Sequence, residues 1–209
     1  MFLDTVPPKP VVLCDLDGVV IDLMPAWLRR YNAEYGDTLT LAQIVEWDMV
    51  KAVKPECGKD IYKYLHNHEL YDDAQPIEGA LEGITELRKL GYRVVFATAT
   101  NMHMAGRKLR WLAEHGFLEL THGTISYDYV ELQDKSLLSG TGAVAIIDDY
   151  AKNLHGFTNG ELRILFPAHH NVRDRHEPGF HRPDSWRGAV ELLAIHQLCG
   201  YPHADLARA

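Results

Sequence analysis

Four short, strongly apolar segments recur along the chain; the first three end at polar or acidic residues, and Pro167 closes the fourth. Such β-branched and aromatic runs predict buried strands, and they lie at 11–14, 92–98, 143–148 and 163–166. Apolar residues recur at helical spacing at 79–90, 104–115 and 186–198. Strands that alternate with helices predict an α/β fold, here a three-layer Rossmann-like core with a parallel sheet. Active groups of such folds gather at the carboxyl ends of the strands.

The segment between the first two predicted strands departs from this alternation. Residues 23–76 have helical patterning and many aromatic side chains, but no strong buried strand. We interpret them as a small helical cap inserted after the first strand, with 1–22 and 77–209 forming the core. The first cap helix places Trp27 and Tyr31 on one face, because residues four apart are neighbours on a helix.

Length, charge and cysteine content restrict the class of protein. The 209 residues suffice for one main domain with a modest insertion. A net charge of -8 argues against a nucleic acid polymer as partner, because binding one requires excess Lys and Arg. No apolar run approaches the roughly 18 residues of a membrane span, and the N-terminus lacks a secretory pattern. We therefore expect a cytoplasmic protein that binds a small molecule, without disulfides among its three cysteines.

Two carboxylates stand where the first predicted strand ends, in Asp15-Leu16-Asp17-Gly18-Val19. A solvated loop is the alternative, but loops seldom place Asp directly after four apolar residues. One carboxylate at this position can attack phosphorus and hold a hard cation, while the other protonates a leaving alkoxide and later activates water. The motif therefore favours catalysis or metal binding.

Asp148-Asp149 ends the third predicted strand in the same manner. Acidic residues at two strand ends of one parallel sheet converge, and without a cation they repel one another. Oxygen ligands without a Cys/His set favour Mg²⁺ over Zn²⁺. We predict a Mg²⁺ site.

Thr98 closes the second predicted strand, and Lys135 lies between the second and third predicted strands. The Thr98 hydroxyl and the neighbouring backbone N–H groups could hold phosphate oxygens. Lys135 could neutralise a transferring phosphoryl group, although a lysine at such a place is more often a surface residue.

In chain order, these elements resemble the signature of the haloacid dehalogenase-like (HAD) superfamily of phosphohydrolases over the whole core. The resemblance implies a Mg²⁺-dependent phosphomonoester hydrolase, with Asp15 as the nucleophile that forms an aspartyl-phosphate and Asp17 as general acid and base. It also implies two ligand sets: Thr98, Ala99 and Lys135 for phosphate, and Asp15, the backbone carbonyl of Asp17 and either Asp148 or Asp149 for Mg²⁺.

A narrower resemblance is to the 5′(3′)-deoxyribonucleotidases, which share Asp-x-Asp-Gly-Val, an inserted helical cap and a Pro-x-x-Gly-Ala motif, here Pro76-Ile77-Glu78-Gly79-Ala80. Further matches follow in order at 134–136, 147–149, 166–171 and 185–187. The resemblance implies that the substrate is a nucleoside monophosphate. The family usually follows its phosphate-binding Thr with Ser and Pro, whereas this chain has Thr98-Ala99-Thr100, so one hydroxyl contact is missing or moved to Thr100.

In that family aromatic cap residues enclose the nucleobase, and Trp47, Tyr64 and Tyr71 are the candidates here. For each of them, packing in the core of the cap is the alternative. The preferred base, the position of the ester and the oligomeric state, including a homodimer, are left open by the sequence.

Two other functions stay open. The first is the same chemistry on a sugar phosphate, phosphoserine or another small phosphometabolite. The second is a non-catalytic phospholigand-binding protein, against which the complete acidic set argues. The His-rich stretch 169–181 has the composition of a solvated loop rather than a transition-metal site, with contact to substrate as the alternative.

Overall fold

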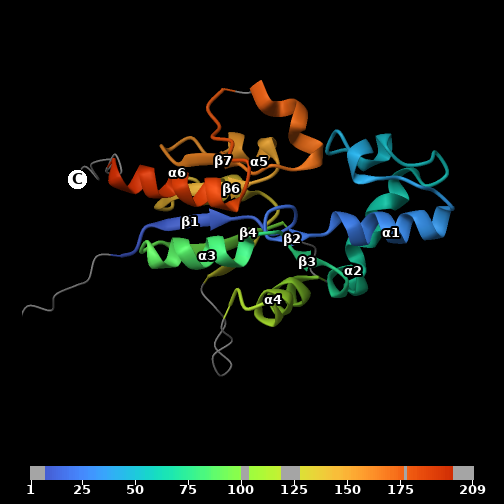
Figure 1. The fold of residues 1–209 in the computed structure, drawn as a ribbon, viewed down its shortest axis with the longest axis horizontal. Coiled ribbons are helices and arrows are strands. Elements are labelled where there is room, and N and C mark those ends of the chain that lie inside the picture. The colour runs from blue at the N-terminus through green and yellow to red at the C-terminus, as the bar shows by residue number, and fades with distance from the viewer. Residues whose placement is uncertain (1–7, 100–103, 119–127, 177, 200–209) are drawn as a thin grey trace, which may run out of the picture.

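A five-stranded sheet, with its strands in the order β5-β4-β1-β6-β7 and all neighbouring strands parallel, forms the centre of the molecule (Figure 1). The computed structural model describes residues 8–99, 104–118, 128–176 and 178–199. The strands of the sheet are β1 (Val11–Cys14), β4 (Arg93–Thr98), β5 (Tyr129–Glu131), β6 (Ala143–Asp148) and β7 (Leu162–Leu165). The predicted α/β fold with a parallel sheet is confirmed.

Helices cover both faces of the sheet. Successive side chains of a strand point to opposite faces, and on β1 they belong to two different core clusters. Val12 and Cys14 belong to a large core cluster that includes residues of α3 (Ala80–Lys89), α4 (Ala105–Glu114) and α6 (Trp186–Leu198). Leu13 belongs to a second, smaller cluster with residues of α5 (Ala151–His155). The result is the three-layer arrangement that the sequence predicts.

Residues 23–76 lie beyond the carboxyl end of β1, in the direction of its arrowhead (Figure 1). They form α1 (Met24–Tyr35), the 3-10 helices η1 (Leu41–Gln43), η2 (Met49–Lys51) and η3 (Gly58–His66), and α2 (His68–Asp72). The short strands β2 (Ile21–Asp22) and β3 (Gln75–Pro76) pair antiparallel at the two ends of this segment. The chain therefore leaves and returns at one place, which suits an inserted cap, and the boundaries of core and cap stay a prediction.

The predicted strands and helices agree with the structure to within one residue at every end, but several short elements were not predicted. β5 has only three residues, all half-buried, and α5 has only five, so neither shows a measurable periodicity. Two further 3-10 helices are η4 (Lys135–Leu138) and η5 (His169–His176). None of the helices in the described ranges is long and apolar enough to cross a membrane.

Trp186 of α6 packs against α3 and forms a hydrogen bond with the loop after β1. Its side chain is 1% exposed, and its indole Nε1 donates a hydrogen bond of 2.9 Å to the carbonyl oxygen of Val19. Gly83 of α3 makes room for the ring, because a Cβ at this position would lie 2.6 Å from Trp186 Cε3. The glycine thus permits the packing that holds the Asp15–Val19 loop from behind.

We expect Gly83→Ala to lower the free energy of unfolding by about 1 kcal/mol, because overpacking costs about 1–3 kcal/mol and outweighs the better helix propensity of alanine. Chemical denaturation followed by tryptophan fluorescence measures the change. Gly106→Ala in α4 is the matched control, since a Cβ there has nothing within 4 Å and should leave stability equal or higher. Equal stability of Gly83→Ala and wild type would contradict the packing role.

Candidate active site

Asp15 stands at the carboxyl end of the central strand β1, and its carboxylate has two unequal oxygens. Oδ1 accepts a hydrogen bond of 2.7 Å from the backbone N–H of Leu16 and lies 2.7 Å from Lys135 Nζ. Oδ2 accepts no hydrogen bond from any residue of the described ranges. The Asp15 N–H donates to the carbonyl of Ile147 in β6, which fixes the residue to the neighbouring strand. The carboxylate is thus oriented and keeps one oxygen available.

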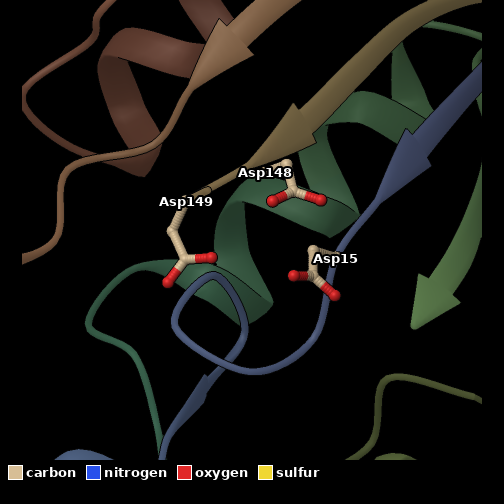
Figure 2. A group of neighbouring side chains, drawn as sticks. All are labelled: Asp15, Asp148 and Asp149. Carbon is tan, nitrogen blue, oxygen red and sulfur yellow. The ribbon is translucent and has the colours of Figure 1, made fainter. Parts of the chain in front are cut away.

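Asp15, Asp148 and Asp149 converge from the ends of β1 and β6 (Figure 2). Each can offer one oxygen such that the three oxygens lie within 4.8 Å of one another, and all three residues are buried. The predicted meeting of the two acidic strand ends is what the structure shows. Such a set of hard oxygen atoms fits Mg²⁺.

The two acids of β6 differ in how many donors hold them. Lys135 Nζ lies 2.7 Å from Asp148 Oδ2, and Asp148 also accepts hydrogen bonds from Asn153 Nδ2 and the N–H of Tyr150. For the Asp149 side chain, the part of the chain that the structure describes provides one neighbouring donor group, His170 Nε2, at 3.4 Å from Oδ2. Asp149 is therefore held by fewer donors than Asp148 and is the better candidate for a cation ligand.

Gly18 brings the loop after β1 directly against Asp149. A Cβ on Gly18 would lie 1.9 Å from Asp149 Oδ2, and the glycine has a φ of +82°, which disfavours other residues. The glycine of the Asp-x-Asp-Gly motif is needed for this close approach as well as for the turn.

Burial and the repulsion between neighbouring carboxylates shift the pKa values of the acidic cluster. Burial, followed by the charges of Asp15 and Asp148, raises the pKa of Asp149 well above its usual range. Burial likewise raises the pKa of Asp148 to about 6, although Lys135 opposes this change. Burial alone would lower the pKa of Lys135, but Asp15 and Asp148 raise it, so the lysine stays charged. A divalent cation would relieve the repulsion and keep Asp149 ionised.

Lys108 of α4 is a site residue that the sequence analysis missed. Its side chain is 2% exposed, and Nζ donates to Asp17 Oδ2 at 2.7 Å, to Thr98 Oγ1 at 2.9 Å and to the carbonyl of Ala99 at 3.0 Å. Within the described part of α4, Arg107, Lys108, Trp111 and Leu112 are buried, whereas the apolar Leu109 and Ala113 are only partly buried. A lysine within that buried stripe is the signal that could have revealed it.

A cavity of about 230 Å³ connects the acidic cluster with the cap segment. Its polar end includes the predicted residues Asp15, Asp17, Thr98, Ala99, Lys135 and Asp149. Its apolar side is formed by cap residues, among them Trp27, Ile44, Met49 and Leu65. Thr100 lies outside the described residues. The predicted nucleophile, acid and phosphate ligands thus share one cavity.

The three aromatic cap candidates take different positions. Trp47 lines the cavity, is half-exposed, and stacks on Tyr150 with ring centroids 4.7 Å apart. Tyr64 is buried in the cap and donates to Glu34 Oε2 at 2.5 Å, and Tyr71 is buried and donates to Asp17 Oδ2 at 3.2 Å. Within the described ranges, the structure brings only Trp47 of these three to the cavity wall.

The His-rich stretch contributes to the site more than its composition indicates. His170 lines the cavity, and Asn171 is 4% exposed and donates to the carbonyls of Asp149 and Phe166 at 2.8 and 2.7 Å. The interpretation as a solvated loop is wrong at these two residues, because they pack against the end of β6. The periodicity of the sequence could not show these contacts, because His170 and Asn171 bind a residue that lies 21 and 22 positions earlier in the chain.

Comparison with known proteins agrees with this geometry. Residues 9–198 match the family model described as 5′ nucleotidase, deoxy (Pyrimidine), cytosolic type C protein. A 5′(3′)-deoxyribonucleotidase of Clostridium acetobutylicum is 32% identical over 190 residues, covering 88% of this chain and 94% of that protein. The human mitochondrial 5′(3′)-deoxyribonucleotidase is 25% identical over 183 residues, covering 84% of this chain and 78% of that protein.

Solved structures show the same fold at low sequence identity. The crystal structure of a HAD family hydrolase from Deinococcus radiodurans, which holds bound phosphate and sodium, matches with a TM-score of 0.63 at 18% identity, covering 91% of this chain and 97% of that one. A haloacid dehalogenase-like family protein from Streptococcus pneumoniae matches with a TM-score of 0.60 at 14% identity, covering 90% and 99%. The family model and the bacterial relative both span most of the chain, so the chain belongs to the 5′(3′)-deoxyribonucleotidase family of HAD-fold phosphohydrolases.

Proposed function

We propose that this enzyme dephosphorylates nucleoside monophosphates through an aspartyl-phosphate on Asp15. The observation that carries the proposal is the Asp15 carboxylate itself, which Lys135 and the Leu16 N–H hold by Oδ1 at the polar end of the cavity while Oδ2 is left available. A carboxylate held in this way is preorganised to attack a phosphorus atom in line.

The first half of the reaction transfers the phosphoryl group. Asp15 Oδ2 attacks phosphorus, the ester P–O bond breaks, and the departing oxygen takes the proton of Asp17, so that the nucleoside leaves as an alcohol. Thr98, Ala99 and Lys135 line the cavity beside Asp15 and would bind the phosphate oxygens. The charge of Lys135 stabilises the negative charge that gathers on them.

The second half regenerates the carboxylate. Asp17, now ionised, takes a proton from a water molecule, and the resulting hydroxide attacks phosphorus. The bond between phosphorus and Asp15 breaks, which releases inorganic phosphate and restores both aspartates to their starting states. Asp17 lines the cavity next to Asp15, as both steps require.

Asp15, the backbone carbonyl of Asp17 and Asp149 would hold Mg²⁺, which neutralises phosphate charge when it is bound. Asp149 is preferred to Asp148 because Lys135, Asn153 and the Tyr150 N–H already occupy the Asp148 carboxylate. Asp148 then serves to hold Lys135 in place.

We propose further that the nucleobase stacks on Trp47. Tyr150 supports the indole from the core side, and Trp47 is 50% exposed, so part of its surface is free for a base. Tyr150 follows directly after Asp149 in the chain and thereby joins the base site to the acidic cluster. A cytoplasmic location remains a prediction from the sequence.

The decisive assay measures Mg²⁺-dependent phosphate release from nucleoside 5′- and 3′-monophosphates, sugar phosphates and phosphoserine. We expect turnover of nucleotides, and Asp15→Asn should lower kcat by a factor of about 10³ or more because no covalent intermediate can form. Turnover of a different ester would keep the mechanism and change the substrate. Equal rates for wild type and Asp15→Asn on every ester would refute the enzymatic proposal.

Asp149→Asn should weaken Mg²⁺ binding about tenfold or more, because a charged oxygen ligand is lost from the cluster. Isothermal titration calorimetry with Mg²⁺ measures the dissociation constant without any turnover. Asp60→Asn removes an exposed acid of η3 in the cap and should leave the dissociation constant unchanged. An unchanged affinity in Asp149→Asn would exclude Asp149 as a direct ligand.

Trp47→Ala should lower kcat/KM for nucleoside monophosphates about tenfold or more, since stacking supplies roughly 1–3 kcal/mol per base. Ribose 5-phosphate lacks a base and should lose little, which makes it the internal control for the same variant. Steady-state kinetics on both substrates give the comparison. Equal losses on both would show that Trp47 supports the cavity rather than the base.

A further inference from the structure

The two oxygens of Asp17, the acid that the proposed function assigns to proton transfer, have very different surroundings. Oδ2 lies 2.7 Å from Lys108 Nζ and accepts a hydrogen bond of 3.2 Å from the hydroxyl of Tyr71. Oδ1 is buried and has no hydrogen-bond partner among the described residues. The described residues therefore hold the Asp17 side chain by one oxygen, Oδ2.

Tyr71 and Lys108 hold Asp17 without forming the wall of the cavity. Asp17 is among the described residues that line it, whereas Tyr71 and Lys108 are not. Both side chains are 2% exposed. Burial, followed by the charge of Asp17, raises the pKa of the Tyr71 hydroxyl well above its usual range, so it remains a hydrogen-bond donor.

Tyr71 comes from the cap segment and Lys108 from the core, and their two helices are docked on each other. Next to them in the chain, Asp72 of α2 forms an ion pair with the buried Arg107 of α4. Trp111 Nε1 donates to the carbonyl of Ala74 at 3.2 Å, at the end of the same cap segment. Adjacent residues of α2 thus contact adjacent residues of α4, which sets the position of the Tyr71 hydroxyl relative to Asp17.

We propose that Tyr71 is a positioning residue that, together with Lys108, holds Asp17 by Oδ2 and so fixes the position of its carboxylate at the cavity for proton transfer. The inference rests on the proposed function, in which Asp17 is the proton donor. The packing of α2 against α4 thereby fixes the position of the Asp17 carboxylate for proton transfer. Tyr71 is not part of the base site, although the sequence made it a candidate for one.

The test compares leaving groups in a single turnover, where only the first half of the reaction is observed. A nucleoside leaves as a poor alkoxide and needs the proton, whereas 4-nitrophenolate leaves without one. We expect Tyr71→Phe to slow nucleoside release from a nucleoside monophosphate about tenfold, and release of 4-nitrophenolate from its phosphate ester by less than about twofold. Rapid-quench and stopped-flow measurements give the two rates.

Tyr64→Phe is the matched control, because it removes a hydroxyl from another buried tyrosine of the cap whose partner is Glu34 rather than Asp17. Both of its rates should equal those of wild type. Adding Tyr71→Phe to Asp17→Asn should cause no further loss on the nucleotide, because a residue that acts through Asp17 has no effect once the acid is gone.

Three results would overturn the inference: equal slowing of both substrates by Tyr71→Phe, no slowing of either, or an additional loss in the double variant. Equal slowing would indicate a general structural role. These outcomes are distinct from failure of the proposed function, in which the wild-type protein would release neither leaving group faster than Asp15→Asn.

Discussion

The site depends on the two ion pairs that the buried ammonium group of Lys135 makes with Asp15 and Asp148. The ammonium group lies 2.7 Å from an oxygen of Asp15 at the end of β1 and 2.7 Å from an oxygen of Asp148 at the end of β6. A buried charge is costly unless it is paired, and here one lysine pairs with acids from two adjacent strands. It thereby allows the two acidic strand ends to approach, and leaves Asp149 and one oxygen of Asp15 for a cation and a substrate.

A second buried lysine, Lys108, contacts a different acid of the site. Lys108 approaches Asp17 and the end of β4 from α4, while Lys135 approaches Asp15 and Asp148 from η4. The acid proposed as nucleophile and the acid proposed for proton transfer therefore have separate cationic partners, from opposite layers of the fold. Two carboxylates two residues apart in the chain can in this way be given different roles by their surroundings.

The residues of the core motifs were accessible to sequence reasoning because strands and helices of ordinary length carry a strong periodicity. Asp15, Thr98 and Asp148 each close an apolar run, and parallel strands bring such ends together. The same reasoning could not tell which of Trp47, Tyr64 and Tyr71 lines the cavity. Each is an aromatic residue in a helical segment, and whether such a residue faces a cavity depends on how short helices pack against each other.

The sequence by itself determined the α/β class, the order of the motifs, the helical insertion and the family. These follow from local patterns: runs of apolar residues, residues at fixed spacing, and the glycine after Asp17. Only the tertiary structure decided that Asp148 rather than Asp149 accepts from Asn153, that Lys108 is buried against Asp17, and that Tyr71 contacts the acid. Those facts depend on contacts between residues up to 91 positions apart, which no local pattern encodes.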